Sequence, residues 1–233
     1  MTEHNGVYSA YINSQFKSLK ADSEKSRKTS RPFVTISRET GAYGLTIAKG
    51  LGEYLQKHER RKECPWTVFD NELLKKVVEE HDLPETVLPY LSESTISEIE
   101  DMMEEICGLH PSRHLLVHET SKTILHLAQL GYSIIVDWGA GIITAKVPRG
   151  VHVRLISSLD KRISHMQEYL KVSKKEAEEY VIKKDHNRSS YVKKYFERNI
   201  SDPLLYDLII NVDSVGPQEA VRVIGNLVLK HYA

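Results

Sequence analysis

The segment Phe33-Val-Thr-Ile-Ser-Arg-Glu-Thr-Gly-Ala-Tyr-Gly-Leu-Thr-Ile-Ala-Lys-Gly-Leu-Gly-Glu-Tyr-Leu55 joins an apolar run to an amphipathic run through a turn that contains two glycines. This pattern predicts a strand, a turn and a helix. Gly41 and Gly44 allow the backbone to approach a ligand closely, and the helix N-terminus adds a dipole that favours anions. The segment therefore predicts a phosphate-binding loop, with an ordinary strand-to-helix turn as the alternative.

The turn departs from the standard phosphate loop at one position. In that motif a lysine directly precedes the Ser or Thr whose hydroxyl binds magnesium. Thr46 supplies the hydroxyl here, but the lysine position is Leu45, or Gly44 if the alignment slides by one residue. Neither residue supplies a cation, and we expect Lys49, one helical turn further, to lie on the surface. The loop alone is a weak match to the motif.

The composition excludes several classes of protein. The chain has 233 residues, enough for one α/β domain with a small addition, and its 32 basic and 32 acidic residues cancel. No basic excess indicates a nucleic acid partner, and no apolar run is long enough to cross a membrane. Cys64 and Cys107 lack metal or redox spacing, and the N-terminus lacks the pattern of a signal peptide. We expect a cytoplasmic protein.

The first 31 residues differ in character from the rest. Apolar positions recur with helical spacing from Val7 to Lys20, and a polar, charged linker follows as far as Arg31. We expect residues 1–31 to form a helical arm that packs on the protein or mediates a homodimer. Residues 32–233 are then the main domain.

Short apolar segments alternate with longer helical segments through the main domain. The predicted strands begin at Phe33 and then cover residues 66–70, 132–137, 150–157 and 208–213. Helices are predicted over residues 71–80, most of 84–106, 112–130 and 217–230, with the acidic run 98–105 as a solvated helix face. This alternation predicts a three-layer α/β fold, in which a parallel sheet of about five strands carries helices on both faces.

Polar residues follow several of the predicted strands. Arg38, Asp70, Asp137 and the Ser157-Ser158 pair each lie at or just past a strand end. In sheets of this kind ligands bind at the carboxyl ends of the strands. We therefore expect these residues to converge on one cleft.

A cationic segment occupies the C-terminal third of the chain. Ser173 and Glu176 form a capping-box pattern that starts a helix, and this helix carries Lys184, Asp185 and Arg188. Arginine offers bidentate donors to phosphoryl oxygens, and a carboxylate can hold it in place between turnovers. A helical lid over phosphates at about residues 172–200 is one interpretation, and a solvated basic helix face is the other.

The order of the motifs along the chain adds to their meaning. The most specific are Ile36-Ser-Arg-Glu39, Asp185-His-Asn-Arg188-Ser-Ser-Tyr191 and Pro203-Leu-Leu-Tyr-Asp-Leu-Ile-Ile-Asn211. From Phe33 onward the chain resembles the cytidylate kinase-like family, a bacterial branch of the nucleoside monophosphate kinases. The resemblance implies a P-loop kinase core, a helical monophosphate-binding region and an arginine-bearing lid.

Site residues follow from the resemblance position by position. It implies that the turn binds donor phosphates through Arg38, Gly41, Ala42, Tyr43, Gly44, Leu45 and Thr46. It implies that Arg162 and Arg188, and as a further candidate Arg154, neutralise charge on the transferred phosphoryl group, while Asp185 orients a lid arginine. Asp70 would border the acceptor nucleoside. The implied cofactors are ATP and Mg²⁺, with a nucleotide as substrate.

Two places depart from the family pattern. The loop has Tyr43 where a small residue is usual, and the segment that commonly reads Gly-Arg-Gly-Ala is Asp137-Trp138-Gly139-Ala140. Asp137 could serve magnesium through water, and Trp138 could stack on a base. Equally, both could mark a member that binds nucleotide without turning it over.

Three functions are compatible with these features. The first is ATP-dependent phosphoryl transfer to a nucleoside monophosphate, with CMP as the leading guess. The second is nucleotide sensing or binding on a catalytically degenerate kinase scaffold, and the third is phosphoryl transfer to a non-nucleotide small molecule. The cations of the predicted lid favour an enzyme, whereas the absent loop lysine favours the second function.

Overall fold

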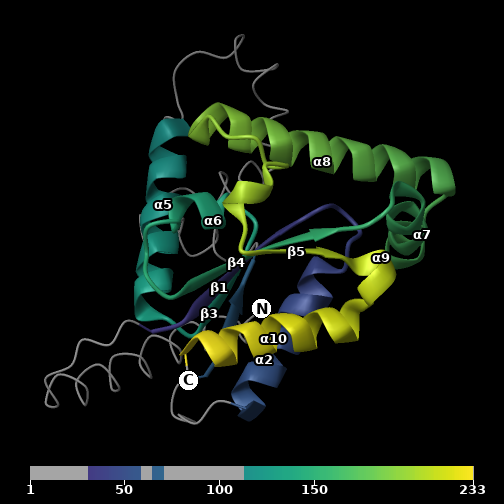
Figure 1. Ribbon diagram of the computed structural model, residues 1–233. Helices are drawn as coiled ribbons and strands as arrows, with labels where there is room; N and C mark the ends of the chain where they lie inside the picture. The colour runs from purple at the N-terminus through teal and green to yellow at the C-terminus, as the bar shows by residue number, and fades with distance from the viewer. Residues whose placement is uncertain (1–30, 59–64, 71–112, 233) are drawn as a thin grey trace, which may run out of the picture.

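The computed structural model describes residues 31–58, 65–70 and 113–232 (Figure 1). The predicted N-terminal arm, the helices over 71–80 and 84–106, the acidic run and both cysteines lie outside these residues. Among the described helices, none is both long enough and apolar enough to span a membrane.

A parallel sheet forms the centre of the molecule. Its strands are β1 (Phe33–Arg38), β2 (Thr67–Phe69), β3 (Ser133–Val136), β4 (Gly150–Ile156) and β5 (Leu208–Asn211), in the order β2-β3-β1-β4-β5. Every neighbouring pair is parallel, with β1 between β3 and β4. The predicted parallel sheet of about five strands is therefore confirmed.

The last strand is shorter than predicted. It ends at Asn211, whose side chain accepts a hydrogen bond from the backbone N–H of Asp213 at 3.0 Å. This cap begins the short helix α9 (Val212–Val215) in place of the last two predicted strand residues.

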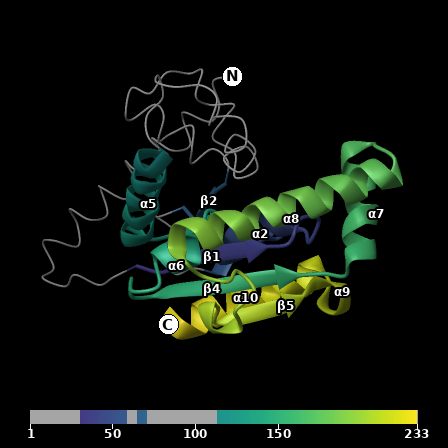
Figure 2. The ribbon, with the colours of Figure 1, turned by 90° about the horizontal axis from the view of Figure 1, so that it is seen from above.

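Helices cover both faces of the sheet (Figures 1 and 2). Alternate residues of β1 point to opposite faces, so that Val34 and Ile36 join one core cluster and Phe33 joins the other. The first cluster includes α2 (Gly44–His58) and α10 (Pro217–Tyr232), and the second includes α5 (Arg113–Leu130), α6 (Ala140–Ile143) and part of α8 (Lys174–Phe196). The three-layer prediction is confirmed.

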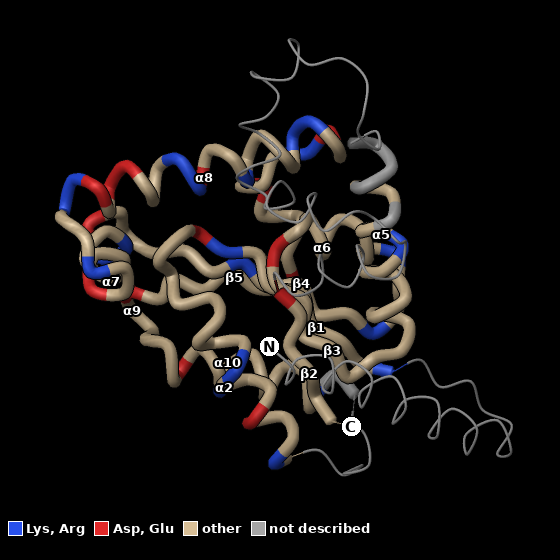
Figure 3. The backbone as a smooth tube through the Cα atoms, turned by 180° about the vertical axis from the view of Figure 1, so that it is seen from behind, with Lys and Arg blue, Asp and Glu red and all other residues tan. Residues whose placement is uncertain are grey.

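The helices α7 (Leu159–Leu170) and α8 form a hairpin beyond the carboxyl end of β4. The predicted capping box is present at the start of α8, where Ser173 and Glu176 exchange hydrogen bonds. Charges of both signs follow one another along these two helices (Figure 3). The hairpin therefore is not a uniformly basic surface.

Candidate functional site

A cavity of about 420 Å³ lies at the carboxyl ends of the central strands. Predicted site residues line much of it: Arg38, Gly41, Tyr43, Gly44, Leu45, Thr46, Asp70, Asp137 and Arg188. The convergence of Arg38, Asp70 and Asp137 on one cleft is thus observed, since β1, β2 and β3 end at the same edge of the sheet.

Each of the two loop glycines is required for a different reason. Gly41 has φ +87°, and a Cβ there would lie 2.7 Å from the carbonyl oxygen of Arg162. A Cβ on Gly44 would lie 1.9 Å from Cδ of Arg38. The side chain of Arg38 therefore crosses the first residue of α2, in space that only glycine leaves open.

Arg38 and Arg188 share one carboxylate. Oδ2 of Asp137 lies 3.0 Å from Nη2 of Arg38 and 3.4 Å from Nε of Arg188. The Asp137 side chain is 8% exposed. Ion pairs at this degree of burial are sheltered from solvent screening, so the carboxylate holds both guanidinium groups at the cavity wall.

The residues after β3 adopt an unusual backbone. Asp137, Trp138 and Gly139 have φ values of 69°, 60° and 65°. Non-glycine residues rarely occupy this left-handed region, and such strain persists only where surrounding contacts hold it. The turn aims Asp137 at the cavity and sends the Trp138 ring the other way, into the core beneath α8.

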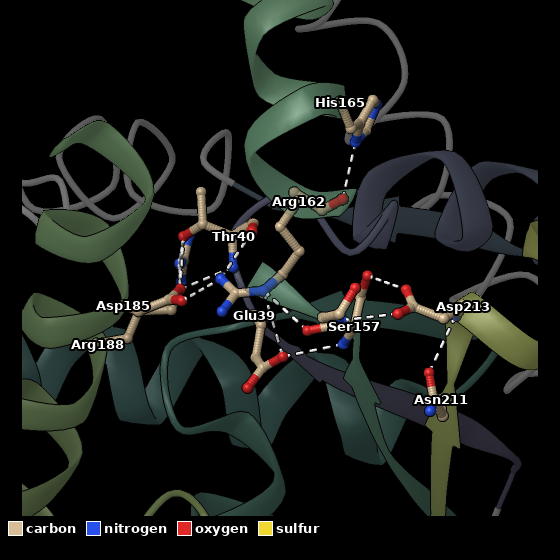
Figure 4. A network of polar contacts seen from close by, with 11 residues as sticks. Glu39, Thr40, Ser157, Arg162, His165, Asp185, Arg188, Asn211 and Asp213 are labelled. Atoms are coloured by element: carbon tan, nitrogen blue, oxygen red, sulfur yellow. Dashed lines mark hydrogen bonds and ion pairs between the residues drawn. The ribbon is translucent and has the colours of Figure 1, made fainter. Parts of the chain in front are cut away.

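A second carboxylate fastens α8 to the loop (Figure 4). Oδ1 of Asp185 accepts hydrogen bonds from the backbone N–H and the hydroxyl of Thr40, both at 2.7 Å. Nη1 of Arg188 donates to the Thr40 hydroxyl oxygen at 2.6 Å. Asp185 and Arg188 were predicted to act together, and they do meet here, on a threonine that sequence reasoning did not single out.

Arg162 completes this network but does not line the cavity. Its Nη1 lies 2.5 Å from Oδ2 of Asp185 and 3.2 Å from the carbonyl oxygen of Thr40, and its Nε donates to the carbonyl oxygen of Ser157. The side chain is 9% exposed. In this structure Arg162 holds Asp185, and its catalytic role stays a prediction.

Two further predicted ligands are placed elsewhere. Trp138 is 1% exposed and packs against Tyr191 with ring centroids 6.0 Å apart, so that protein covers the ring that was predicted to stack on a base. Ala42 is buried, and its backbone N–H donates to the carbonyl oxygen of Glu39 at 3.1 Å. That N–H group closes the turn.

The Ser157-Ser158 pair belongs to a separate cluster beside the site. The Asp213 carboxylate accepts hydrogen bonds from the Ser157 hydroxyl and from the backbone N–H of Ser158. These bonds, with Ser157 the larger influence, lower the pKa of Asp213 from 3.8 to about 2. The pair fixes the start of α7 and does not join the predicted cleft.

Seven residues of the cavity wall were not predicted as site residues: Thr40, Lys49, His165, Met166, Tyr169, Tyr180 and Lys184. Lys49 is exposed, as predicted, but it faces the cavity. Lys184 adds a cation from α8 at the position four residues before Arg188. The spacing of four within α8 was a usable signal for Tyr180 and Lys184, whereas His165 and Tyr169 could be found only once α7 was packed against the loop.

The donor set suits phosphate better than metal. Nε of Arg38 is buried and has no hydrogen-bond partner among the described residues. The first intrahelical bond of α2 runs from the N–H of Ile47 to the carbonyl of Tyr43, so the preceding N–H groups of the helix have no intrahelical acceptor. Within the described ranges, no three His, Cys, Asp or Glu side chains gather in a group that could hold a metal ion.

The parallel sheet, the helices on both of its faces and the glycine turn after its central strand define a three-layer α/β fold. An uncharacterized protein from Eubacterium ventriosum shares this fold, with a TM-score of 0.64 and 19% identity over 86% of this chain and 99% of that chain. Two shikimate kinases superpose less closely. The Bacteroides thetaiotaomicron enzyme has a TM-score of 0.47 and 12% identity over 85% and 98% of the chains. The Acinetobacter baumannii enzyme in complex with shikimate has 0.46 and 11% over 87% and 96%.

The sequence itself gives the family. The model of the cytidylate kinase-like family matches residues 33–214, and the chain therefore belongs to that family. No curated protein matches it. Membership of a kinase-like family supports phosphoryl transfer as the class of reaction.

Proposed function

We propose that this protein transfers a phosphoryl group from ATP to a nucleoside monophosphate, with CMP as the leading acceptor. The observation that carries the proposal is that a glycine turn and four cationic side chains line one cavity. The cations are Arg38, Lys49, Lys184 and Arg188. Phosphoryl transfer needs mainly positioning and stabilisation of charge, and this arrangement supplies both without an acid–base group.

Arg38 takes the place of the missing loop lysine in this proposal. Its side chain crosses Gly44 and reaches the cavity from the end of β1, and its buried Nε has a donor to offer. An anion at the start of α2 would compete with Asp137 for the Arg38 guanidinium. Arg188 would then stabilise charge on the transferred group, and Asp185 would orient it.

The acceptor would lie on the β2 side of the cavity. Asp70 follows β2, two strands from β1 in the sheet, and it lines the same cavity as the loop. A carboxylate there can accept hydrogen bonds from a sugar hydroxyl or an exocyclic amine. We therefore retain Asp70 as the proposed acceptor-binding residue.

Magnesium fits only one of its two proposed ligands. Thr46 lines the cavity and can offer its hydroxyl oxygen. Asp137 does not fit, because its Oδ2 is engaged by two guanidinium groups that would repel a cation. We propose that Mg²⁺ enters with the phosphates of ATP and meets Thr46, and that Asp137 serves as a counter-ion.

Nucleotide binding without turnover is the second candidate function. The observation that favours it is the pairing of Asp137 with two arginines. This carboxylate offsets the charge of both arginines that would act on the phosphoryl group. Phosphorylation of a non-nucleotide acceptor is the third candidate, and it would use the same donor end of the cavity. A homodimer through the N-terminal arm and a lid motion of residues 172–200 belong to the proposal as well.

A coupled ADP-release assay with ATP, Mg²⁺ and a panel of nucleoside monophosphates tests the proposal. Turnover with CMP or another member is the expected result. Arg188→Ala should lower turnover about 10²-fold while ATP affinity falls far less, because the guanidinium acts on charge that develops in the transition state. Arg198→Ala, an exposed arginine just past α8, is the matched control. Stabilisation by nucleotides without turnover of any acceptor would select the second function.

A further inference from the structure

The residues that line the cavity change from cationic at one end to aromatic at the other. On α8 the residues that line it are Tyr180, Lys184 and Arg188, spaced by four and therefore on one helix face. From Tyr180 to Arg188 the helix rises ~12 Å, at 1.5 Å per residue. A ligand that lies along this face meets the Arg188 guanidinium at one end and the Tyr180 ring at the other, with the Lys184 ammonium 5.4 Å from the centroid of that ring.

The helix α7 also contributes aromatic and apolar residues to the cavity wall beyond the cationic end. On α7, His165, Met166 and Tyr169 line the cavity, and they begin one turn after Arg162, which holds Asp185 behind the wall. Tyr169 is 70% exposed and Tyr180 is 36% exposed. The fold does not bury these two rings, yet both line the cavity that holds the cations.

The loop contributes a fixed aromatic pair to the same wall. The Tyr43 and His165 rings are stacked, with centroids 3.8 Å apart and an angle of 13° between the planes. Nδ1 of His165 donates to the carbonyl oxygen of Gly41 at 2.8 Å, which fixes this ring on the loop. Tyr43 also holds a left-handed φ of 57°. Contacts between α7 and the loop thus maintain an aromatic surface at some cost in backbone strain.

We propose that Tyr43, His165, Tyr169 and Tyr180 form an aromatic platform that binds the base of the nucleoside triphosphate donor. Flat aromatic faces bind nucleobases by stacking, with little dependence on which base is present. A ligand that is anionic at one end and flat and aromatic at the other is a nucleotide. This inference rests on the proposed function, because it assigns the phosphates to the cationic end.

The sheet order assigns the platform to the donor and not to the acceptor. The helix α7 follows β4, whereas Asp70 follows β2, and β1 with its phosphate loop lies between these two strands. Adjacent strands lie about 4.8 Å apart, so that the ends of β2 and β4 are about 14 Å from each other. The two nucleosides therefore occupy opposite sides of the phosphates, with the donor base toward α7.

Calorimetric titration of the full chain with ATP and with inorganic tripolyphosphate tests the platform. The two ligands share the triphosphate, and only ATP carries a base. We expect the wild-type protein to bind ATP about tenfold more tightly than tripolyphosphate. The double variant Tyr169→Ala/Tyr180→Ala should lose this advantage and keep the wild-type affinity for tripolyphosphate. Tyr169→Phe/Tyr180→Phe, which keeps both rings, should retain it.

The possible outcomes distinguish a failure of the aromatic platform from a failure of the phosphate site. An advantage of ATP that survives in the alanine variant would overturn the platform and leave the phosphate site intact. A parallel loss of both ligands in that variant, with an unchanged melting temperature, would overturn it as well, since the rings would then support the cation site. A wild-type protein that binds neither ligand would refute the proposed function and the platform with it.

Discussion

At the scale of single residues, Gly44 determines where the cation of the loop can lie. A Cβ at this position would overlap Cδ of Arg38, and the side chain of Arg38 would have to leave its path across α2. Gly44→Ala should therefore weaken tripolyphosphate binding about as much as Arg38→Met does, roughly tenfold for the loss of a charge-assisted contact. Calorimetric titration measures both effects.

A double-mutant cycle tests whether the two residues act as one unit. Because each single variant removes the same guanidinium from the cavity, the double variant should bind no more weakly than either one. Gly50→Ala, in the same helix but not on the cavity wall, is the control. Additive losses would mean that Gly44 serves close backbone approach to the anion, as in the standard motif.

The same scale shows which site residues could be predicted. Arg38, Asp70 and Asp137 were found because the end of a parallel strand fixes where the next side chains lie. The burial of Trp138 was not predicted, because three successive left-handed residues turn its ring into the core and no sequence rule foresees that turn. Tyr169 and Tyr180 were not predicted, because the side of a helix that faces a cavity depends on the elements that pack against the helix.

At the scale of elements, α8 is joined to the loop chiefly through Asp185. Asp185→Ala would leave the largely buried Arg162 without its closest carboxylate. It would also remove the acceptor of the hydrogen bonds that the backbone N–H and the hydroxyl of Thr40 donate. The free energy of unfolding should fall by about 1–3 kcal/mol. Amide hydrogen exchange should rise along α8 because the helix loses its anchor to the loop. Urea denaturation and exchange measurements check the two effects.

A second carboxylate of the same helix provides the comparison. Glu179 makes an exposed pair with Lys175 at a spacing of four residues. Glu179→Ala should cost no more than about 0.5 kcal/mol, since solvent screens such pairs. Equal costs for the two variants would show that the Asp185 network contributes little beyond a surface ion pair.

The start of α7 carries a pH dependence that can be assigned to one group. The bonds from Ser157 and Ser158 lower the pKa of Asp213 to about 2, and the unfolded group titrates near 3.8. A carboxyl whose pKa is lowered by folding stabilises the protein above the unfolded value and loses that effect as pH falls toward the folded value. The stability difference between wild type and Asp213→Asn should therefore shrink between pH 4 and about 2.

Urea denaturation of both proteins across this pH range measures the difference. Other carboxyl groups titrate in the same window, but they are common to both proteins and cancel in the comparison. A constant difference across the window would assign the effect of the substitution to packing and not to ionisation.

Element boundaries were predictable where a local signal sets them. The capping box of Ser173 and Glu176 begins α8, and Gly131, with φ +75°, ends α5 through a hydrogen bond to Leu127. The end of β5 was missed by two residues, although Asn211 is a good cap. Val212 and Asp213 continue the alternation of apolar and polar residues past it, so that the pattern alone extends the strand two residues too far.

At the scale of the whole molecule, alternation of short strands and helices was enough to predict a parallel sheet, but not its strand order. The order β2-β3-β1-β4-β5 arises because the chain crosses to one side of β1 and later to the other. That reversal brings Asp70, Asp137, Arg38 and the α7–α8 hairpin to one edge. Residues more than a hundred positions apart in sequence thus share the cavity. The spacing of residues within one motif therefore cannot predict which of them meet there.

Asp137 is where this long-range assembly links stability to ligand binding. It joins the ends of β1 and β3 to α8 through Arg38 and Arg188. Asp137→Asn should lower the free energy of unfolding by about 1–3 kcal/mol, because Arg38 loses its carboxylate partner and Arg188 keeps only its pair with Asp185. The same change should raise tripolyphosphate affinity about tenfold in the presence of EDTA, because the anion no longer competes with a carboxylate for the arginines. Urea denaturation and titration measure the two quantities, and Asp160→Asn, an exposed acid that is not among the cavity-lining residues, controls for net charge. If Asp137 instead bound magnesium, wild-type affinity would depend on Mg²⁺ and the asparagine variant would lose that dependence without gaining affinity.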